Sequence, residues 1–218
     1  MGKADELTKL YQKIFQCRDC QPKVFPSKVP RRVLENTLNS KIVFMAQAPS
    51  DCGVRISGVH WNKEDGTLTR GGSFLDKQLD IIKYSVNFKS TTQRPYTTNV
   101  LQCWTGRAGK GRDRTPNEDE LINCKKYRQA ELNIIKPPIM ILLGAPAIEG
   151  FSQVIGKKWT LPEMLKNQGE YITIGDIKLL VFGLPHPSAS YKEDNEPYRK
   201  QTQLYQERFQ QIKRILNI

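Results

Sequence analysis

The chain has 218 residues and a formal net charge of +12, with 34 Lys and Arg against 22 Asp and Glu. Its apolar content is typical of a globular protein, and no run approaches the roughly 18 apolar residues of a membrane-spanning helix, so we expect no such helix. The basic excess favours a polyanionic partner, because each neutralised phosphate releases counterions. The first 15 residues lack the apolar core of a signal peptide, so we expect a cytoplasmic protein.

Apolar periodicity predicts helices and strands that alternate along the chain. Helices are expected at 4–15, 74–86, after Pro116, after Gly144 and at 197–216. Strands are expected at 41–47, 96–101, 138–143, 171–174 and 178–184, the last two forming a hairpin whose second arm is the fourth central strand. This alternation predicts one domain over residues 1–218, an α/β fold of three layers, α/β/α, around a mostly parallel four-stranded sheet.

Two apolar runs stop at proline-containing turns. Residues 41–50, KIVFMAQAPS, break at Pro49, which has no N–H to give to a central strand. Residues 179–184 stop at Pro185-His186-Pro187. Since ligands of open α/β sheets bind beyond the carboxyl ends of strands, we expect both turns to face one site.

Two loops carry further signals. The segment 51–70 is long, polar and rich in glycine, and loops of this length in compact domains are usually functional. The composition of the segment 105–114, TGRAGKGRDR, predicts a mobile surface loop. Its four cationic side chains are candidates for contacts to nucleic-acid phosphates, with simple solvation as the alternative: Arg107, Lys110, Arg112 and Arg114.

Four of the five cysteines form a pattern. Cys17 and Cys20 make a C-x2-C pair, and 20 residues separate Cys103 from Cys124. Four thiolates suit zinc or an iron–sulfur cluster, and spacing alone does not choose between them. Unrelated buried cysteines are the alternative. Cys52 is interpreted as a spare thiol.

The ordered set of motifs resembles the family 4 uracil-DNA glycosylases. The set comprises C-x2-C, a strand ending in A-Q-A-P, G-x-H-W, a T-N-V strand end before Cys103, R-x-P with an acidic helix start and Cys124, K-P with an apolar strand and Gly144, and H-P-S. The resemblance implies an α/β/α fold with a structural [4Fe–4S] cluster held by Cys17, Cys20, Cys103 and Cys124. It also implies hydrolysis of the N-glycosidic bond of deoxyuridine in DNA.

By position, the resemblance assigns Gln47 and Ala48 to the first motif, Trp61 to stacking on uracil, Asn99 to base reading and His186 to the second motif. The family's first motif is usually G-E-(A/G)-P-G, whereas this chain has A-Q-A-P-S. The amide of Gln47 can orient water but cannot take its proton. A related group forms a covalent link to the abasic sugar through a histidine in the loop after the T-N-V strand. Residues 105–115 contain none, so we expect no such link.

The residue types fit base excision. Trp61 can stack on an extruded base, with ordinary core packing as its alternative, and the neighbouring His60 can face either DNA or the base. An Asn side chain both donates and accepts, so Asn99 can distinguish uracil from cytosine, and otherwise it caps a loop.

The remaining candidates concern the leaving group, the water and the phosphates. His186 can donate a hydrogen bond to the departing uracil anion. Asp51 is a candidate base for the water, or else a turn residue. Ser188 and the backbone amide of Ser50 are candidates for holding phosphates.

We therefore expect a monomeric, monofunctional uracil-DNA glycosylase. One alternative is an iron–sulfur, DNA-binding member of the superfamily with weak, altered or lost activity. Another is a zinc-stabilised nucleic-acid-binding protein without a base pocket.

Overall fold

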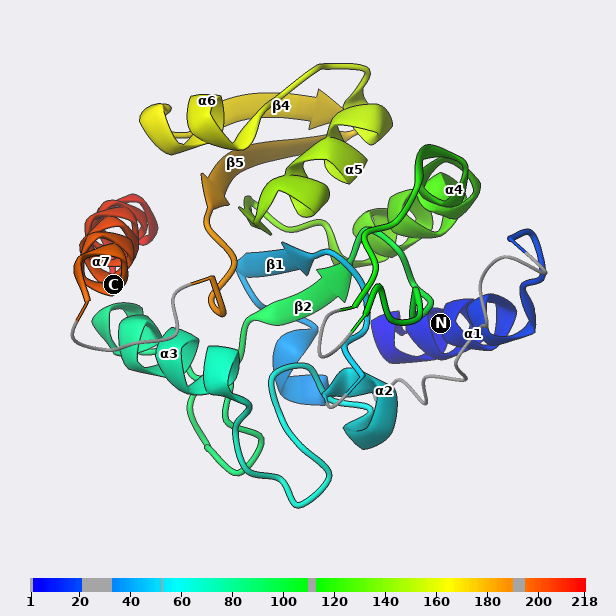
Figure 1. Ribbon diagram of the computed structural model, residues 1–218, viewed down its shortest axis with the longest axis horizontal. Coiled ribbons are helices and arrows are strands. Elements are labelled where there is room, and N and C mark those ends of the chain that lie inside the picture. The colour runs from blue at the N-terminus through cyan, green and yellow to red at the C-terminus, as the bar shows by residue number, and fades with distance from the viewer. Residues whose placement is uncertain (1, 21–32, 52, 110–112, 190–194) are drawn as a thin grey trace.

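The computed structural model describes residues 2–20, 33–51, 53–109, 113–189 and 195–218 (Figure 1). Its α-helices are α1 Lys3–Gln16, α2 Val54–Ser57, α3 Arg70–Leu79, α4 Glu118–Ile135, α5 Ala145–Ile155, α6 Leu161–Lys166 and α7 Glu196–Leu216. Two 3₁₀ turns are η1 Glu35–Thr37 and η2 Asp80–Ile82. The strands are β1 Ile42–Ala46, β2 Tyr96–Asn99, β3 Ile139–Leu143, β4 Glu170–Ile174 and β5 Ile177–Leu184. None of the described helices is both long and apolar enough to cross a membrane.

The five strands form one sheet in the order β2-β1-β3-β5-β4. The first four run parallel, and β4 pairs antiparallel with β5 through the expected hairpin. The predicted α/β class and mostly parallel sheet are confirmed, but the count of four strands was one too low. The count covered central strands only, and the first arm of the hairpin joins the sheet as its edge strand.

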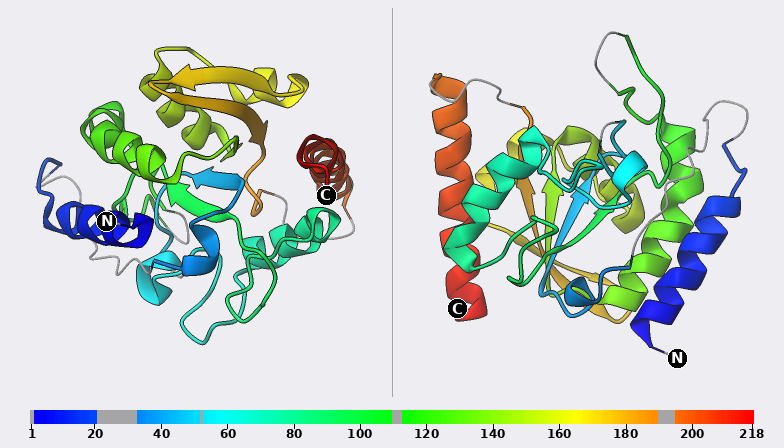
Figure 2. Two further views of the ribbon diagram at one scale, coloured as in Figure 1. Left: turned by 180° about the vertical axis from the view of Figure 1, so that it is seen from behind. Right: turned by 90° about the horizontal axis from the view of Figure 1, so that it is seen from below.

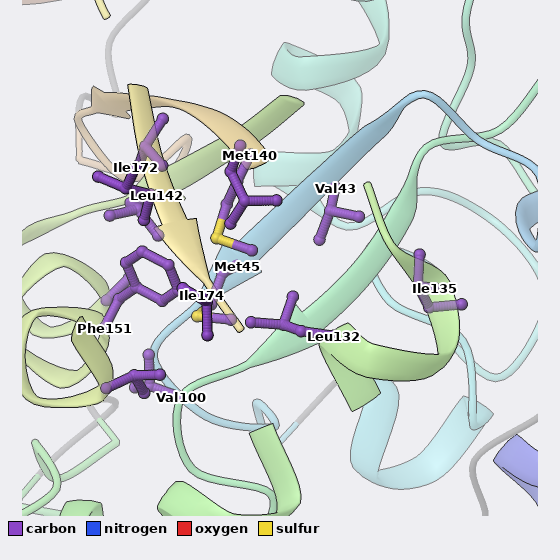
Figure 3. Close-up of a cluster of buried hydrophobic side chains, with 14 of the residues drawn as sticks. Val43, Met45, Val100, Leu132, Ile135, Met140, Leu142, Phe151, Ile172 and Ile174 are labelled. Atoms are coloured by element: carbon purple, nitrogen blue, oxygen red, sulfur yellow. The ribbon is translucent and has the colours of Figure 1, made fainter. Parts of the chain in front are cut away.

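Helices cover both faces of the sheet, giving the three predicted layers. Helices α1, α4 and α5 lie on one face and α3 and α7 on the other (Figures 1 and 2). Along β1, Val43 and Met45 pack toward the first group (Figure 3), while Ile42 and Phe44 pack toward the second. A strand covered on both faces needs apolar residues at every position, which explains the unbroken apolar run.

The helix expected at 74–86 is shorter and starts earlier. Thr69 caps α3 by accepting the N–H of Gly72 over 3.1 Å, and Lys83 ends η2 in the left-handed region at φ 56°. The N–H of Val86 then donates to the Asp76 carboxylate over 2.8 Å. A side chain in α3 thus stabilises the chain after the turn, and Val86 lies outside the helix.

Candidate active site

Four parallel strands end at the same edge of the sheet, and the loops after them carry the predicted site residues. Beyond the strands, the N–H of Val100 donates to the Ala46 carbonyl over 2.9 Å. The N–H of Gly144 donates to the Leu184 carbonyl over 2.8 Å. These bonds hold the loops after β1 and β2, and the ends of β3 and β5, side by side.

Gly144 allows the end of β3 to approach the loop that carries His186. Its φ is 85°, a region that L side chains rarely adopt, and a Cβ there would lie 3.3 Å from the His186 Cβ. A larger residue at position 144 would therefore be strained and would press on the imidazole.

His186 is held with one nitrogen committed to the backbone. The N–H of Ser188 donates to Nδ1 over 3.2 Å, and Gln201 Nε2 donates to the His186 carbonyl over 3.0 Å. Burial lowers the pKa of His186 to about 4, because the surrounding protein disfavours the charged ring. The imidazole is therefore neutral at physiological pH, and its proton lies on Nε2, which can donate to a ligand.

Trp61 packs between the core and His186. Its indole lies 5.9 Å from the imidazole, centroid to centroid, at a 40° tilt, and it contacts the core cluster under α3 and α7. The backbone of Trp61 has φ 69°, and its carbonyl accepts the N–H of Thr69 over 2.7 Å. Its buried Nε1 has no hydrogen-bond partner within the described chain. Trp61 is thus a half-buried wall of the site as well as part of the core.

Asn99 ends β2 with its side chain buried, 1% exposed. Its Nδ2 lies 2.9 Å from Nε2 of His60. Its Oδ1 is buried without a hydrogen-bond partner among the residues that the structure describes. An unsatisfied buried oxygen is costly, so this atom is available to a ligand donor. His60 therefore faces inward, toward the base-reading candidate.

These contacts connect the two predicted turns. His186 contacts Trp61, which follows His60 in the chain, and His60 contacts Asn99. Asn99 is in turn the register partner of Ala46, the residue before Gln47. The structure therefore brings the two proline-containing turns to the same region, beyond the carboxyl ends of the parallel strands.

Gln47 faces the basic loop. Its Nε2 donates to the Arg114 carbonyl over 3.0 Å, a bond that a carboxylate could not make. The amide nitrogen is thus committed to holding the loop, and Oε1 is the end available to orient a water.

Asp51 does not have the environment of a general base. It forms ion pairs with Arg55, over 2.6 Å, and with Arg107. The hydrogen bond from Arg107 is the main cause of the lowered pKa of Asp51. A carboxylate with a lowered pKa stays charged but is a weaker base. Asp51 therefore ties α2 to the basic loop. Cys52 lies outside the described residues.

The basic loop is anchored at both described ends. Arg114 forms a bidentate ion pair with the buried carboxylate of Glu120, and its Nε donates to the Thr105 carbonyl over 3.1 Å. Trp104 Nε1 donates to Asp113 over 2.8 Å. Arg114 thus stabilises the loop, while the side chain of Arg107 is 60% exposed. Lys110 and Arg112 lie outside the described residues.

Ala48 and Ser188 lie in the two turns themselves. Both are partly exposed. A Cβ on Gly71, in the first turn of α3, would come within 2.5 Å of the Ser188 hydroxyl. The second turn therefore sits against the amino end of α3, where backbone N–H groups favour anions.

The four predicted ligand cysteines come together. Cys17, Cys20, Cys103 and Cys124 line one hollow that is partly open to solvent. The N–H of Gln102 points at Cys124 Sγ over 3.3 Å, and Asn123 Nδ2 at Cys20 Sγ over 3.7 Å. Within the described ranges, no three His, Cys, Asp or Glu side chains converge as tightly as a single metal ion requires.

Sequence reasoning missed a buried network behind Asn99. The Glu131 carboxylate, 1% exposed, accepts from Tyr96, Thr98 and Gln102. Gln102 Nε2 also donates to the Asn99 carbonyl over 3.0 Å. Burial and the Glu131 charge raise the pKa of Tyr96 well above its usual range. A carboxylate on the apolar stripe of α4 was the available signal, since buried charges need partners.

Comparison with known proteins agrees with this geometry. The profile described as "Uracil DNA glycosylase superfamily" matches residues 33–213. The chain is 27% identical over 217 residues to the type-4 uracil-DNA glycosylase of Saccharolobus solfataricus, covering 98% of this chain and 88% of the relative. It is 24% identical over 192 residues to that of Sulfurisphaera tokodaii, covering 88% and 78%. It is 26% identical over 186 residues to that of Archaeoglobus fulgidus, covering 85% and 83%.

The relatives carry the family name that the motif order suggested, so the resemblance is confirmed. The family profile covers all five strands and both proline turns. The chain belongs to the uracil DNA glycosylase superfamily.

Proposed function

We propose that this protein is a monofunctional uracil-DNA glycosylase that hydrolyses the bond between uracil and deoxyribose and leaves an abasic site. The observation that carries the proposal is the series of contacts from His186 through Trp61 and His60 to Asn99. It joins a neutral imidazole, an indole and an unsatisfied amide oxygen at one sheet edge. These are the groups that a flipped uracil needs.

Base capture requires extrusion of the nucleotide, which costs a few kcal/mol of pairing and stacking. Trp61 can return about 1 to 3 kcal/mol of this by stacking on the base. Asn99 Oδ1 accepts from uracil N3–H, and Nδ2, which carries a second hydrogen, donates to O4. Cytosine offers the opposite pattern at these two positions and leaves Oδ1 unsatisfied.

His186 stabilises the leaving group. As the bond between C1′ and N1 breaks, the electron pair leaves on uracil and positive charge develops on the sugar. The neutral imidazole donates Nε2–H to uracil O2 and lowers the energy of the anion. A neutral donor suits this step, because a hydrogen bond stabilises the anion without transfer of a proton.

The water that adds to C1′ loses its proton to solvent once the sugar cation has formed. Gln47 Oε1 orients this water by accepting one of its hydrogens. Asp51 was a candidate base, and its two arginine partners argue for a structural duty instead. We assign no general base, because a well-formed sugar cation is attacked readily by neutral water.

DNA binding depends on the basic loop and on the amino end of α3. Arg107, Lys110 and Arg112 are proposed to contact phosphates, whereas Arg114 holds the loop in place for them. Ser188 and the backbone amide of Ser50 are proposed to hold phosphates, and Ala48, in the first motif, is proposed to bind the substrate. One chain supplies all these groups, so we propose that the enzyme acts as a monomer, on DNA inside the cell.

The four cysteines are proposed to hold a [4Fe–4S] cluster. The donor set fits: four thiols surround one hollow, and N–H groups already point at two of the sulfurs, as they do around cluster thiolates. The cluster's part is structural, since it would tie the segment after α1 to α4 and to the loop after β2. A brown purified protein with about four irons per chain supports this assignment, and a colourless zinc protein contradicts it.

The deciding experiment is uracil release from single- and double-stranded DNA with one uracil, run beside His186→Ala. The wild type should release uracil, and the variant should lose about 100-fold to 1,000-fold in turnover while keeping its DNA affinity. No release at high enzyme concentration would favour the alternative, a superfamily member that binds DNA but has lost or changed its chemistry. The replacement of the motif carboxylate by Gln47 is the observation behind that alternative.

A further inference from the structure

The side chain of Asn99 has two chemically different ends, and only one arrangement suits uracil. The oxygen must face the N3–H donor of the base, and the nitrogen must be able to reach O4. In the opposite arrangement the NH₂ group of Asn99 would face the N3–H of uracil, so that donors face each other. That arrangement suits cytosine. Something in the protein must therefore fix which end of the amide faces the base.

The backbone of Asn99 is already fixed, so only rotation of the amide is open. Gln102 Nε2 donates to the Asn99 carbonyl over 3.0 Å, and Ala46 is its register partner on β1. The side chain is buried, with 1% of the residue exposed. The contacts of the amide itself decide its orientation.

His60 makes the contact that decides it. Its Nε2 lies 2.9 Å from Asn99 Nδ2, and an amide nitrogen can only donate, so Nε2 must accept. We propose that His60 is a positioning residue that fixes base specificity: its Nε2 lone pair holds the nitrogen of Asn99 and turns Oδ1 toward the N3–H of uracil. The proposal rests on the proposed function for the identity of the base. The orientation itself rests on the contact.

The two histidines of the chain should then be opposite tautomers. His60 accepts at Nε2 and carries its proton on Nδ1, whereas His186 accepts at Nδ1 from Ser188 and carries its proton on Nε2. If His60 instead carried its proton on Nε2, the amide would have to turn and offer oxygen to the ring. It would then present its NH₂ group to the base and select against uracil.

A long-range ¹H–¹⁵N spectrum of the free protein near pH 7.5 tests the orientation without any turnover. The expected result is one ring with the Nδ1–H pattern and one with the Nε2–H pattern, the second missing in His186→Ala. Two rings of the Nε2–H type would overturn the proposal. So would an Nδ1–H ring that is assigned to His60 by its absence in His60→Gln, but whose Nε2 chemical shift does not change in Asn99→Leu.

The specificity experiment uses free uracil and free cytosine as binding probes. His60→Leu removes the acceptor and should weaken uracil binding about 10-fold to 100-fold, with cytosine binding unchanged, so that discrimination falls. His60→Gln keeps an acceptor oxygen and should recover part of the loss. The control is Thr97→Val, a nearly isosteric change at a residue that lines the same hollow as His60, and it should bind both bases like the wild type.

These two experiments separate the two proposals. His60→Leu with wild-type uracil binding and an intact thermal transition overturns the role of His60, whatever the activity. If His60→Leu fails to fold, uracil binding by His60→Gln and the spectrum of the wild type decide the question. A wild type that shows the two tautomers but releases no uracil overturns the proposed activity and still supports the orientation of the amide by His60.

Discussion

The backbone N–H of Ser188 points at Nδ1 of His186 over 3.2 Å and so leaves the imidazole proton on Nε2. This contact sets the direction in which the ring can donate. Burial adds the second requirement by lowering the pKa of His186 to about 4. Together they prepare a neutral donor before any substrate arrives, which is how preorganised groups stabilise developing charge.

The lowered pKa of His186 predicts a pH dependence of stability. Between pH 6.5 and about 4, the unfolded chain binds a proton at this residue and the folded chain does not. The free energy of unfolding should therefore fall as pH drops through this window, by up to about 1.4 kcal/mol per pH unit from this group. Urea titrations of the wild type and His186→Gln at several pH values measure the difference. Equal slopes in the two proteins would contradict the assignment.

Asn99→Asp should damage base reading. A carboxylate at this position cannot donate to uracil O4, and its charge opposes the developing uracil anion. We expect uracil release to fall about 100-fold, with DNA affinity retained. Asn117→Asp is a matched control, because Asn117 is the N-cap of α4 and aspartate caps helices equally well. Similar losses in both variants would point to general destabilisation.

Gln47→Glu restores the family's usual carboxylate but should destabilise this protein. The new oxygen would face the Arg114 carbonyl where the amide nitrogen now donates. Loss of this bond and repulsion between two acceptors should cost about 1 to 3 kcal/mol of the free energy of unfolding. Gln210→Glu, on the exposed face of α7, provides the control for added charge. Unchanged stability in Gln47→Glu would mean that the loop does not depend on the bond.

Glu131→Leu should weaken both stability and uracil release. It leaves the hydroxyls of Tyr96 and Thr98 and the amide of Gln102 without their common acceptor in the interior. We expect a loss of about 3 kcal/mol in the free energy of unfolding and a smaller loss in Glu131→Gln, which keeps one acceptor oxygen. Thermal unfolding and uracil release measure the two effects. Glu149→Leu, at an exposed position of α5, should change neither.

The local pattern of the chain determined much of the architecture. Unbroken apolar runs with proline after them predicted β1 and β5, because strands covered on both faces must be apolar throughout and proline ends the ladder. The C-x2-C pair and the two later cysteines, predicted from the sequence as ligands of one cluster, line the same hollow. The strand at 171–174 was predicted as a hairpin arm, but its place as the edge strand of the sheet and the early end of the helix after Thr69 were missed, since both depend on partners elsewhere in the chain.

Only the tertiary structure decided which polar groups meet. Asp51, Arg107 and Arg114 look like catalytic or DNA-binding residues in the sequence, yet in the fold each forms an ion pair with an opposite charge. His60 and Asn99 are 39 residues apart, and Gln47 and Arg114 are 67 apart. Residue type and periodicity determine which face of an element is buried. A hydrogen bond between distant segments depends on how whole elements pack, and that information is not local.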